Sequence, residues 1–155
     1  MKPGERSVGV AIFVLRTSGS RDDVLLLQRA GGGFEGTWCP VAGKAEDAEV
    51  PEETARRELQ EETSLVAGEW LRLPSRIVVP TKPGSPTGVI SIFAARVDAN
   101  ASVTIDYEHR DFRWMAIDEA LTLLPLEDQR EALREVERVV LQGKPPLELE
   151  FQVQP

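Results

Sequence analysis

Apolar runs in the first third of the chain predict a β-hairpin. Ser7–Leu15 (SVGVAIFVL) and Val24–Gln28 (VLLLQ) are rich in aliphatic and β-branched residues, and the segment between them, RTSGSRDD, is rich in turn-forming ones. The first run is short and includes small residues, so we interpret it as a strand rather than a signal peptide. A glycine-rich loop, RAGGGFEGTW, then leads to a short strand at Trp38–Val41.

Helical periodicity is present in two segments. Glu52–Glu62 is predicted to be a helix, because Pro51 suits the first helical position and Ala55 and Leu59 lie one turn apart. Glu127–Gln142 is predicted to be the last helix. Its apolar residues share one face that should pack on the core: Leu126, Leu133, Val136 and Val140.

The remaining apolar runs predict further strands. These are Ile77–Val79, Val89–Val97 and a run from about Val103 to Trp114, and the loop TKPGSPTG separates the first two. Asp118 is a candidate cap for a short helix, DEALTLL, and the tail KPPLELEFQVQP is a candidate edge strand. The order of strands, helix, strands and helices favours an α+β domain with helices packed on a mixed sheet.

Composition and charge narrow the class of protein. A chain of 155 residues, 41% hydrophobic and 28% charged, is typical of one soluble domain. No apolar run approaches the roughly 18 residues of a membrane span, and a net charge of −8 gives no electrostatic footprint for nucleic acid. The single cysteine, Cys39, is interpreted as a small semi-buried hydrophobe, and a cytoplasmic location is expected. An anionic substrate would need a mediating cation, for which bound metal is the natural candidate.

Acidic residues are concentrated in the segment Ala45–Glu62, which holds eight acids and two arginines. Glu58, Glu61 and Glu62 fall on one face of the predicted helix, where their mutual repulsion makes sense if a divalent cation neutralises them. Mg²⁺ and Mn²⁺ prefer such oxygen ligands. The alternative is an ordinary solvated helix face supported by Arg57, and carboxylate spacing alone leaves both interpretations open.

The spacing around these acids carries more information. Gly43 is followed by five residues, Glu49, seven residues and then RELQEETSL (57–65). This pattern resembles the Nudix box, G-x5-E-x7-R-E-U-x-E-E-x-G-U, where U is a bulky aliphatic residue. Every defined position matches except Ser64, which stands where the family has glycine. The preceding TWCPVAG and the later EHRDFRWMAIDEA are also similar to the family's segments, so the resemblance covers most of the chain.

The resemblance implies a single Nudix hydrolase domain over residues 1–155, with its box at 43–65. Its fold would be an α/β/α sandwich, in which a mixed β-sheet packs between helices. Mg²⁺ or Mn²⁺, more than one ion, would be the cofactor. The resemblance also implies residue roles: metal ligands at the carbonyl of Gly43 and at Glu58, Glu61 and Glu62, and a structural pair between Glu49 and Arg57.

Two glutamates are candidates for the base that activates water. Glu61 lies in the box. Glu108 precedes a histidine, and the resemblance to the dihydroneopterin-triphosphate/dATP type implies that a glutamate at this place reaches the metal cluster. The alternative for Glu108 is a solvated acid. His109 is interpreted as supporting or structural. Arg29 and Lys44 are candidates for substrate phosphate binding, with surface cations as the alternative for both.

The resemblance implies hydrolysis of a phosphoanhydride bond in a nucleoside-diphosphate-linked small molecule. The VAG lead-in, the EH…W segment and the short chain are similar to the dihydroneopterin-triphosphate/dATP type, whose products are a monophosphate and pyrophosphate. ADP-ribose, sugar nucleotides and dinucleoside polyphosphates are the alternative substrates, and a non-catalytic nucleotide-binding module is the alternative function. Neither nucleic acid nor membrane is expected as a partner, and a homodimer is left open.

Overall fold

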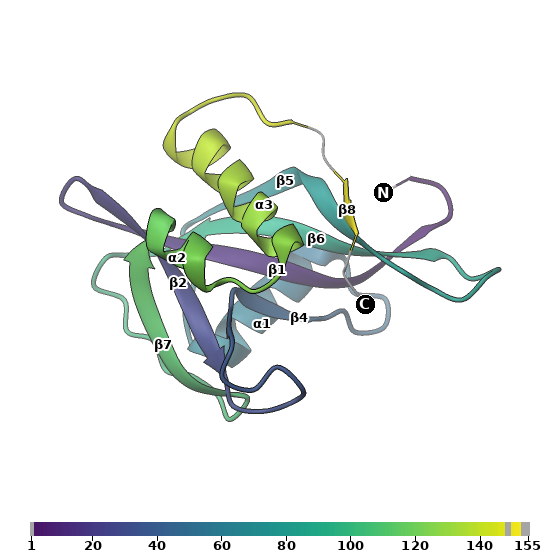
Figure 1. The fold of residues 1–155 in the computed structure, drawn as a ribbon, viewed down its shortest axis with the longest axis horizontal. Helices are drawn as coiled ribbons and strands as arrows, with labels where there is room; N and C mark the ends of the chain where they lie inside the picture. The colour runs from purple at the N-terminus through teal and green to yellow at the C-terminus, as the bar shows by residue number, and fades with distance from the viewer. Residues whose placement is uncertain (1, 148–149, 153–155) are drawn as a thin grey trace.

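A mixed β-sheet organises the molecule (Figure 1). The computed structural model describes residues 2–147 and 150–152. Within these residues the strand order is β3-β2-β1-β6-β5-β8, with β4 also paired to β1 and β7 to β2. The strands are β1 (Glu5–Ser18), β2 (Arg21–Arg29), β3 (Trp38–Cys39), β4 (Val41–Lys44), β5 (Glu69–Val79), β6 (Thr87–Arg96), β7 (His109–Ala116) and β8 (Glu150–Gln152).

Strand β1 lies at the centre of the sheet. On one edge it pairs antiparallel with β2, as the predicted hairpin requires, and with β4; on the other edge it pairs parallel with β6. Every residue from Gly9 to Leu15 is buried. The run is continuously apolar because helices cover both faces of the sheet at this point, which removes the usual alternation of apolar and polar residues.

The helices lie on opposite faces of the sheet. Helix α1 (Pro51–Thr63) covers one face, and α2 (Ile117–Leu123) with α3 (Glu127–Val136) covers the other (Figure 1). Two buried clusters fill the two layers, one including Leu59 of α1 and one including Leu133 of α3. The predicted α/β/α sandwich is therefore confirmed. Among the described residues, no helix has the length and apolar character needed to cross a membrane.

Several strand boundaries differ from the prediction. Pro40, which has no N–H to donate, separates β3 from β4 where one strand was predicted. The predicted strand from Val103 begins only at His109, because a turn in which the His109 N–H donates to the Asp106 carbonyl (3.2 Å) precedes it. Strand β5 extends back to Glu69 because its first residues pair with the end of β6.

The helix ends and the tail also refine the prediction. Asp118 is not a cap: α2 begins after Ala116, and no side chain caps it. The last predicted helix ends as an α-helix at Val136 and continues as a π-helix, η1 (Glu137–Leu141). The tail forms the predicted edge strand, since β8 pairs parallel with β5. The rest of that predicted segment, at 148–149 and 153–155, lies outside the described residues.

Candidate active site

Helix α1 directs two of its glutamates toward strand β4. Burial of Ala55 and Leu59 in the core fixes which face of the helix points inward. Glu58 and Glu62, which flank that face, are consequently almost buried, at 8% and 4% exposure. They lie one turn apart, so their carboxylates are neighbours.

Strand β4 approaches this pair closely enough to require glycine. A Cβ atom on Gly43 would overlap the carboxyl group of Glu58. One residue earlier, the backbone N–H of Ala42 donates to Glu62 Oε1 at 3.4 Å. Strand β4 and helix α1 thus bring Gly43, Glu58 and Glu62 together at one point.

The electrostatics of this point favour a cation. Burial, followed by the adjacent Glu58 carboxylate, raises the pKa of Glu62 to about 9. Two buried carboxylates side by side are costly without a compensating positive charge. Carboxylate and carbonyl oxygens are the ligands that Mg²⁺ and Mn²⁺ prefer. The residues present therefore fit a hard divalent ion.

Arg57 ties the loop before α1 to the helix. Its Nε and Nη2 donate to the two carboxylate oxygens of Glu49 at 2.8 and 2.9 Å, which is bidentate geometry. Nη2 also donates to the carbonyl of Lys44 at 2.9 Å, and Nη1 donates to Glu58 at 2.8 Å. The hydrogen bond from Arg57 lowers the pKa of Glu49 to about 2. This guanidinium therefore holds the loop and orients one of the two buried carboxylates.

Glu61 is linked to Glu58 through Arg57, because the same Nη1 donates to both carboxylates. Its side chain is about half exposed, and Arg57 Nη1 donates to its Oε2 at 3.2 Å. Within residues 2–147 and 150–152, no three or more acidic, histidine or cysteine side chains form a group that could hold a metal ion. The structure brings Glu58 and Glu62 to Gly43 and leaves Glu61 on the neighbouring arginine.

The turn before β7 adds a histidine to this cluster. His109 is buried, with its Nδ1 2.8 Å from Asp106 Oδ1 and its Nε2 4.0 Å from Glu62 Oε1. Glu108, the residue before it, is exposed. Asp106 is not among the site residues predicted from the sequence. The pattern that could have indicated it is an acid three residues before the histidine, in IDYEH. The turn therefore places the hydrogen-bonded pair Asp106–His109 beside Glu62.

Arg29 and Lys44 line different cavities. Arg29 ends β2 opposite His109 and, with Glu108, borders a cavity of about 410 Å³. Lys44 borders a second cavity of about 540 Å³, together with Arg6.

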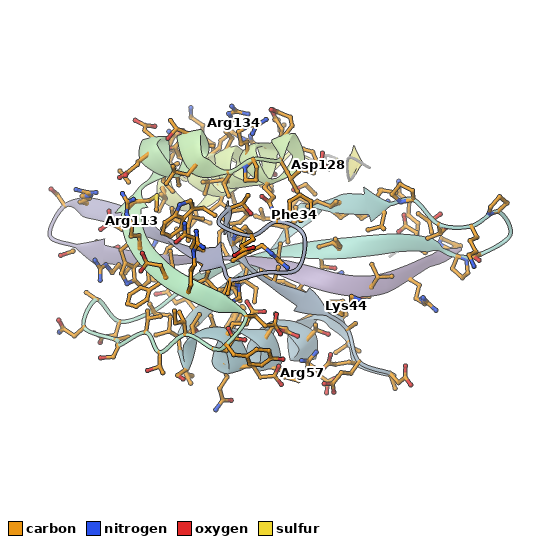
Figure 2. The ribbon with its side chains drawn as sticks, turned by 60° about the horizontal axis from the view of Figure 1, so that its bottom comes forward. Phe34, Lys44, Arg57, Arg113, Asp128 and Arg134 are labelled. Atoms are coloured by element: carbon orange, nitrogen blue, oxygen red, sulfur yellow. The ribbon has the colours of Figure 1, made fainter. Side chains whose placement is uncertain are left out.

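Figure 2 shows Lys44 near the end of β4 and Arg57 on α1, with Phe34 on the glycine-rich loop above them. The two predicted cations therefore do not converge on one phosphate position.

Ser64 adopts the conformation for which the family uses glycine. Its φ and ψ are 62° and 14°, in the left-handed region, and its N–H donates to the Gln60 carbonyl at 2.9 Å. The Thr63 hydroxyl then accepts from the N–H of Leu65 at 3.1 Å. The end of the helix keeps its turn, so Ser64 does not displace the glutamates.

Comparison with known proteins gives a family and several relatives. Residues 5–137 match the NUDIX domain family profile. The chain is 30% identical over 136 residues to the asymmetrical bis(5'-nucleosyl)-tetraphosphatase of Rattus norvegicus. It is 32% identical over 139 residues to the protein of the same name from Sus scrofa. Each alignment covers 84% of this chain and 91% of the relative.

Solved structures share the fold. A Caenorhabditis elegans Ap4A hydrolase binary complex matches with a TM-score of 0.71 at 18% identity, covering 87% of this chain and 97% of that one. The Escherichia coli dihydroneopterin triphosphate pyrophosphohydrolase matches with a TM-score of 0.59 at 21% identity, covering 86% and 95%. At these identities the likeness extends to the fold alone. Proteins of the matched family generally need divalent metal ions.

Proposed function

This chain belongs to the Nudix family of pyrophosphohydrolases, and we propose that it cleaves dinucleoside polyphosphates asymmetrically. Family and enzyme class are as predicted, and the dihydroneopterin-triphosphate subtype stays a prediction. The observation that carries the proposal is the meeting of Glu58 and Glu62 with Gly43. Relatives at 30% and 32% identity, both named as tetraphosphatases, support the choice of substrate.

The proposed metal site uses the carbonyl of Gly43 and the carboxylates of Glu58 and Glu62. A divalent ion held there would neutralise the phosphate chain and stabilise the leaving oxyanion. Glu61 completes the ligand set once it leaves Arg57, a rotation open to it because its side chain is solvent-exposed. His109, which is paired with Asp106, lies beside Glu62.

The chain's own residues then activate water and bind phosphate. Glu61 or Glu108, which is also a candidate ligand, takes a proton from the attacking water. Arg29 and Lys44, which line separate cavities, are the cations that bind substrate phosphates. Water adds across one P–O–P bond, so an asymmetric cut divides four phosphates into a nucleoside monophosphate and a nucleoside triphosphate. We also propose a single domain and a cytoplasmic location, which the sequence favours.

The test is a substrate screen with Mg²⁺ or Mn²⁺ that resolves the nucleotide products by anion-exchange chromatography. Diadenosine tetraphosphate should yield equimolar AMP and ATP. Glu62→Gln should lower kcat about 100-fold, because the proposed metal site would lose an anionic ligand. Glu53→Gln is the matched control: the same change on the same helix, at an exposed position where glutamine preserves the capping box. Absence of turnover with either metal, or full activity in a folded Glu62→Gln variant, would contradict the proposal.

A second substrate class is a nucleoside or pterin triphosphate. The VAG lead-in and the EH…W segment favour it, since both are similar to the dihydroneopterin-triphosphate type. In the same screen this class would release pyrophosphate and a monophosphate. A higher kcat/KM for dATP or dihydroneopterin triphosphate than for diadenosine tetraphosphate would make the triphosphates the preferred substrate class.

A further inference from the structure

The cavity beside the candidate metal centre has two walls from distant parts of the chain. The described residues that line it are Arg29, Ala30, Gly31, Gly32, Tyr107 and Glu108. The Ala30 N–H donates to the Glu108 carbonyl at 2.9 Å, which joins the glycine-rich loop to the turn before β7. Its volume of about 410 Å³ lies in the range of small-molecule sites.

Tyr107 is the unexplained residue of this cavity. The residue is 89% exposed, and neither of the two described hydrophobic clusters includes it. Its neighbours are fixed: the side chains of Asp106 and His109 are in contact at 2.8 Å and close the turn on both sides of it. A fixed turn that presents an aromatic ring to solvent in the wall of a cavity is typical of a binding surface.

The groups around Tyr107 match the parts of a nucleotide. Arg29 supplies a cation for a phosphate, and the reacting centre is close because His109, paired with Arg29 in the sheet, is 4.0 Å from Glu62. An aromatic face next to a phosphate-binding cation suits a base attached to that phosphate.

We infer that Tyr107 is the stacking platform for a nucleobase of the substrate, with Arg29 on the phosphate that follows it. The inference rests on the proposed function, because it names how one end of a nucleotide substrate is bound there. A ring face attracts every base, and the side chains that line this cavity offer few groups to read base edges. The site therefore accepts adenine and guanine alike, and favours purines over pyrimidines by their larger face.

Calorimetric binding of AMP and ribose 5-phosphate, both with Mg²⁺, isolates the contribution of the base without any turnover. The wild-type protein should bind AMP about ten-fold more tightly than ribose 5-phosphate, within the range measured for stacking on an aromatic side chain. Tyr107→Ala should bring this ratio close to one, and Tyr107→Phe should keep it. Both variants should fold, because Tyr107 is almost fully exposed. Val66→Ala, an exposed apolar position outside this cavity, is the control.

Retention of the ratio in Tyr107→Ala would overturn the inference. So would a ratio near one in the wild-type protein. Phe34→Ala removes the half-exposed ring of the glycine-rich loop. If this variant brings the affinity ratio to one while Tyr107→Ala preserves it, the inference is also wrong. A protein that shows the expected ratios but hydrolyses no nucleotide would contradict the proposed reaction and support the stacking site, so the two failures are distinct.

Discussion

At the scale of single residues, glycine at position 43 allows β4 to approach α1 closely, because it has no Cβ atom. The Glu58 carboxyl group occupies the space that a Cβ atom on Gly43 would need. Glu58 is also held by Arg57, so it has little freedom to move aside. The position of one carboxylate in the candidate metal site thus depends on a residue of another element.

Gly43→Ala should therefore lower kcat/KM about 10- to 100-fold while leaving the fold intact, because the new methyl group displaces Glu58. Gly68→Ala is the control, since a Cβ there meets nothing within 4 Å. Nucleotide hydrolysis with Mg²⁺ measures the effect, and far-UV circular dichroism checks the fold. An alanine variant with wild-type activity would show that the close approach is irrelevant to catalysis.

Residue spacing could predict only part of this site. Glu58 and Glu62 follow from helical geometry, because both lie on one element with a known period. The orientation of Glu61 does not follow, since it depends on the position of the Arg57 guanidinium. Asp106 and Tyr107 lie in an irregular turn, where no period indicates which side chains point inward.

At the scale of elements, the end of α1 departs from the family pattern without losing its geometry. Ser64 occupies the left-handed region at φ 62°, which is costly for a residue with a Cβ. The following hydrogen bond from Leu65 to the Thr63 hydroxyl supports the turn. The chain therefore maintains a strained cap at the last turn of the helix that carries the glutamates.

Ser64→Gly should raise the free energy of unfolding by about 1 kcal/mol, because glycine adopts this conformation without steric strain. Urea denaturation followed by fluorescence measures the change, and Ser64→Ala, which keeps the Cβ, should give no such gain. A glycine variant less stable than the wild-type protein would mean that the serine hydroxyl contributes more than the strain costs.

The elements themselves were predictable where the determining contacts are local. The hairpin of β1 with β2 and the start of α1 at Pro51 follow from turn residues and periodicity nearby in the chain. The start of β5 does not, because Glu69 becomes strand by pairing with Arg96 on β6. Pro74 inside β5 hides this strand further, and it lies where the register with β6 shifts.

At the scale of the whole molecule, an acidic protein must bind an anionic substrate. The net charge is −8. The candidate site combines buried carboxylates of α1 with the Asp106–His109 pair in the turn before β7. These groups come together only in the folded chain, where α1 packs on β4 and β7 pairs with β2. A cation that binds them therefore binds the native state in preference to the unfolded chain, and should stabilise it.

Mg²⁺ should consequently raise the melting temperature relative to EDTA. At ten times Kd the added stability is about 1.4 kcal/mol, or roughly 3–6 °C for a domain of this size. Differential scanning calorimetry should show this shift in the wild-type protein and in Glu53→Gln, and a much smaller one in Glu62→Gln. An equal shift in all three would place the ion elsewhere.

The parallel pairing of β1 with β6 also sets an order of assembly during synthesis. At about 5–20 residues per second, the roughly 80 residues between Leu15 and Arg96 take about 4–16 s to emerge. In that interval β1 can pair with β2 and β4 on one edge, and its other edge exposes unpaired N–H and C=O groups. A nascent chain that already carries its candidate metal-binding carboxylates thus passes through a stage in which one edge of its central apolar strand is open to a neighbouring chain.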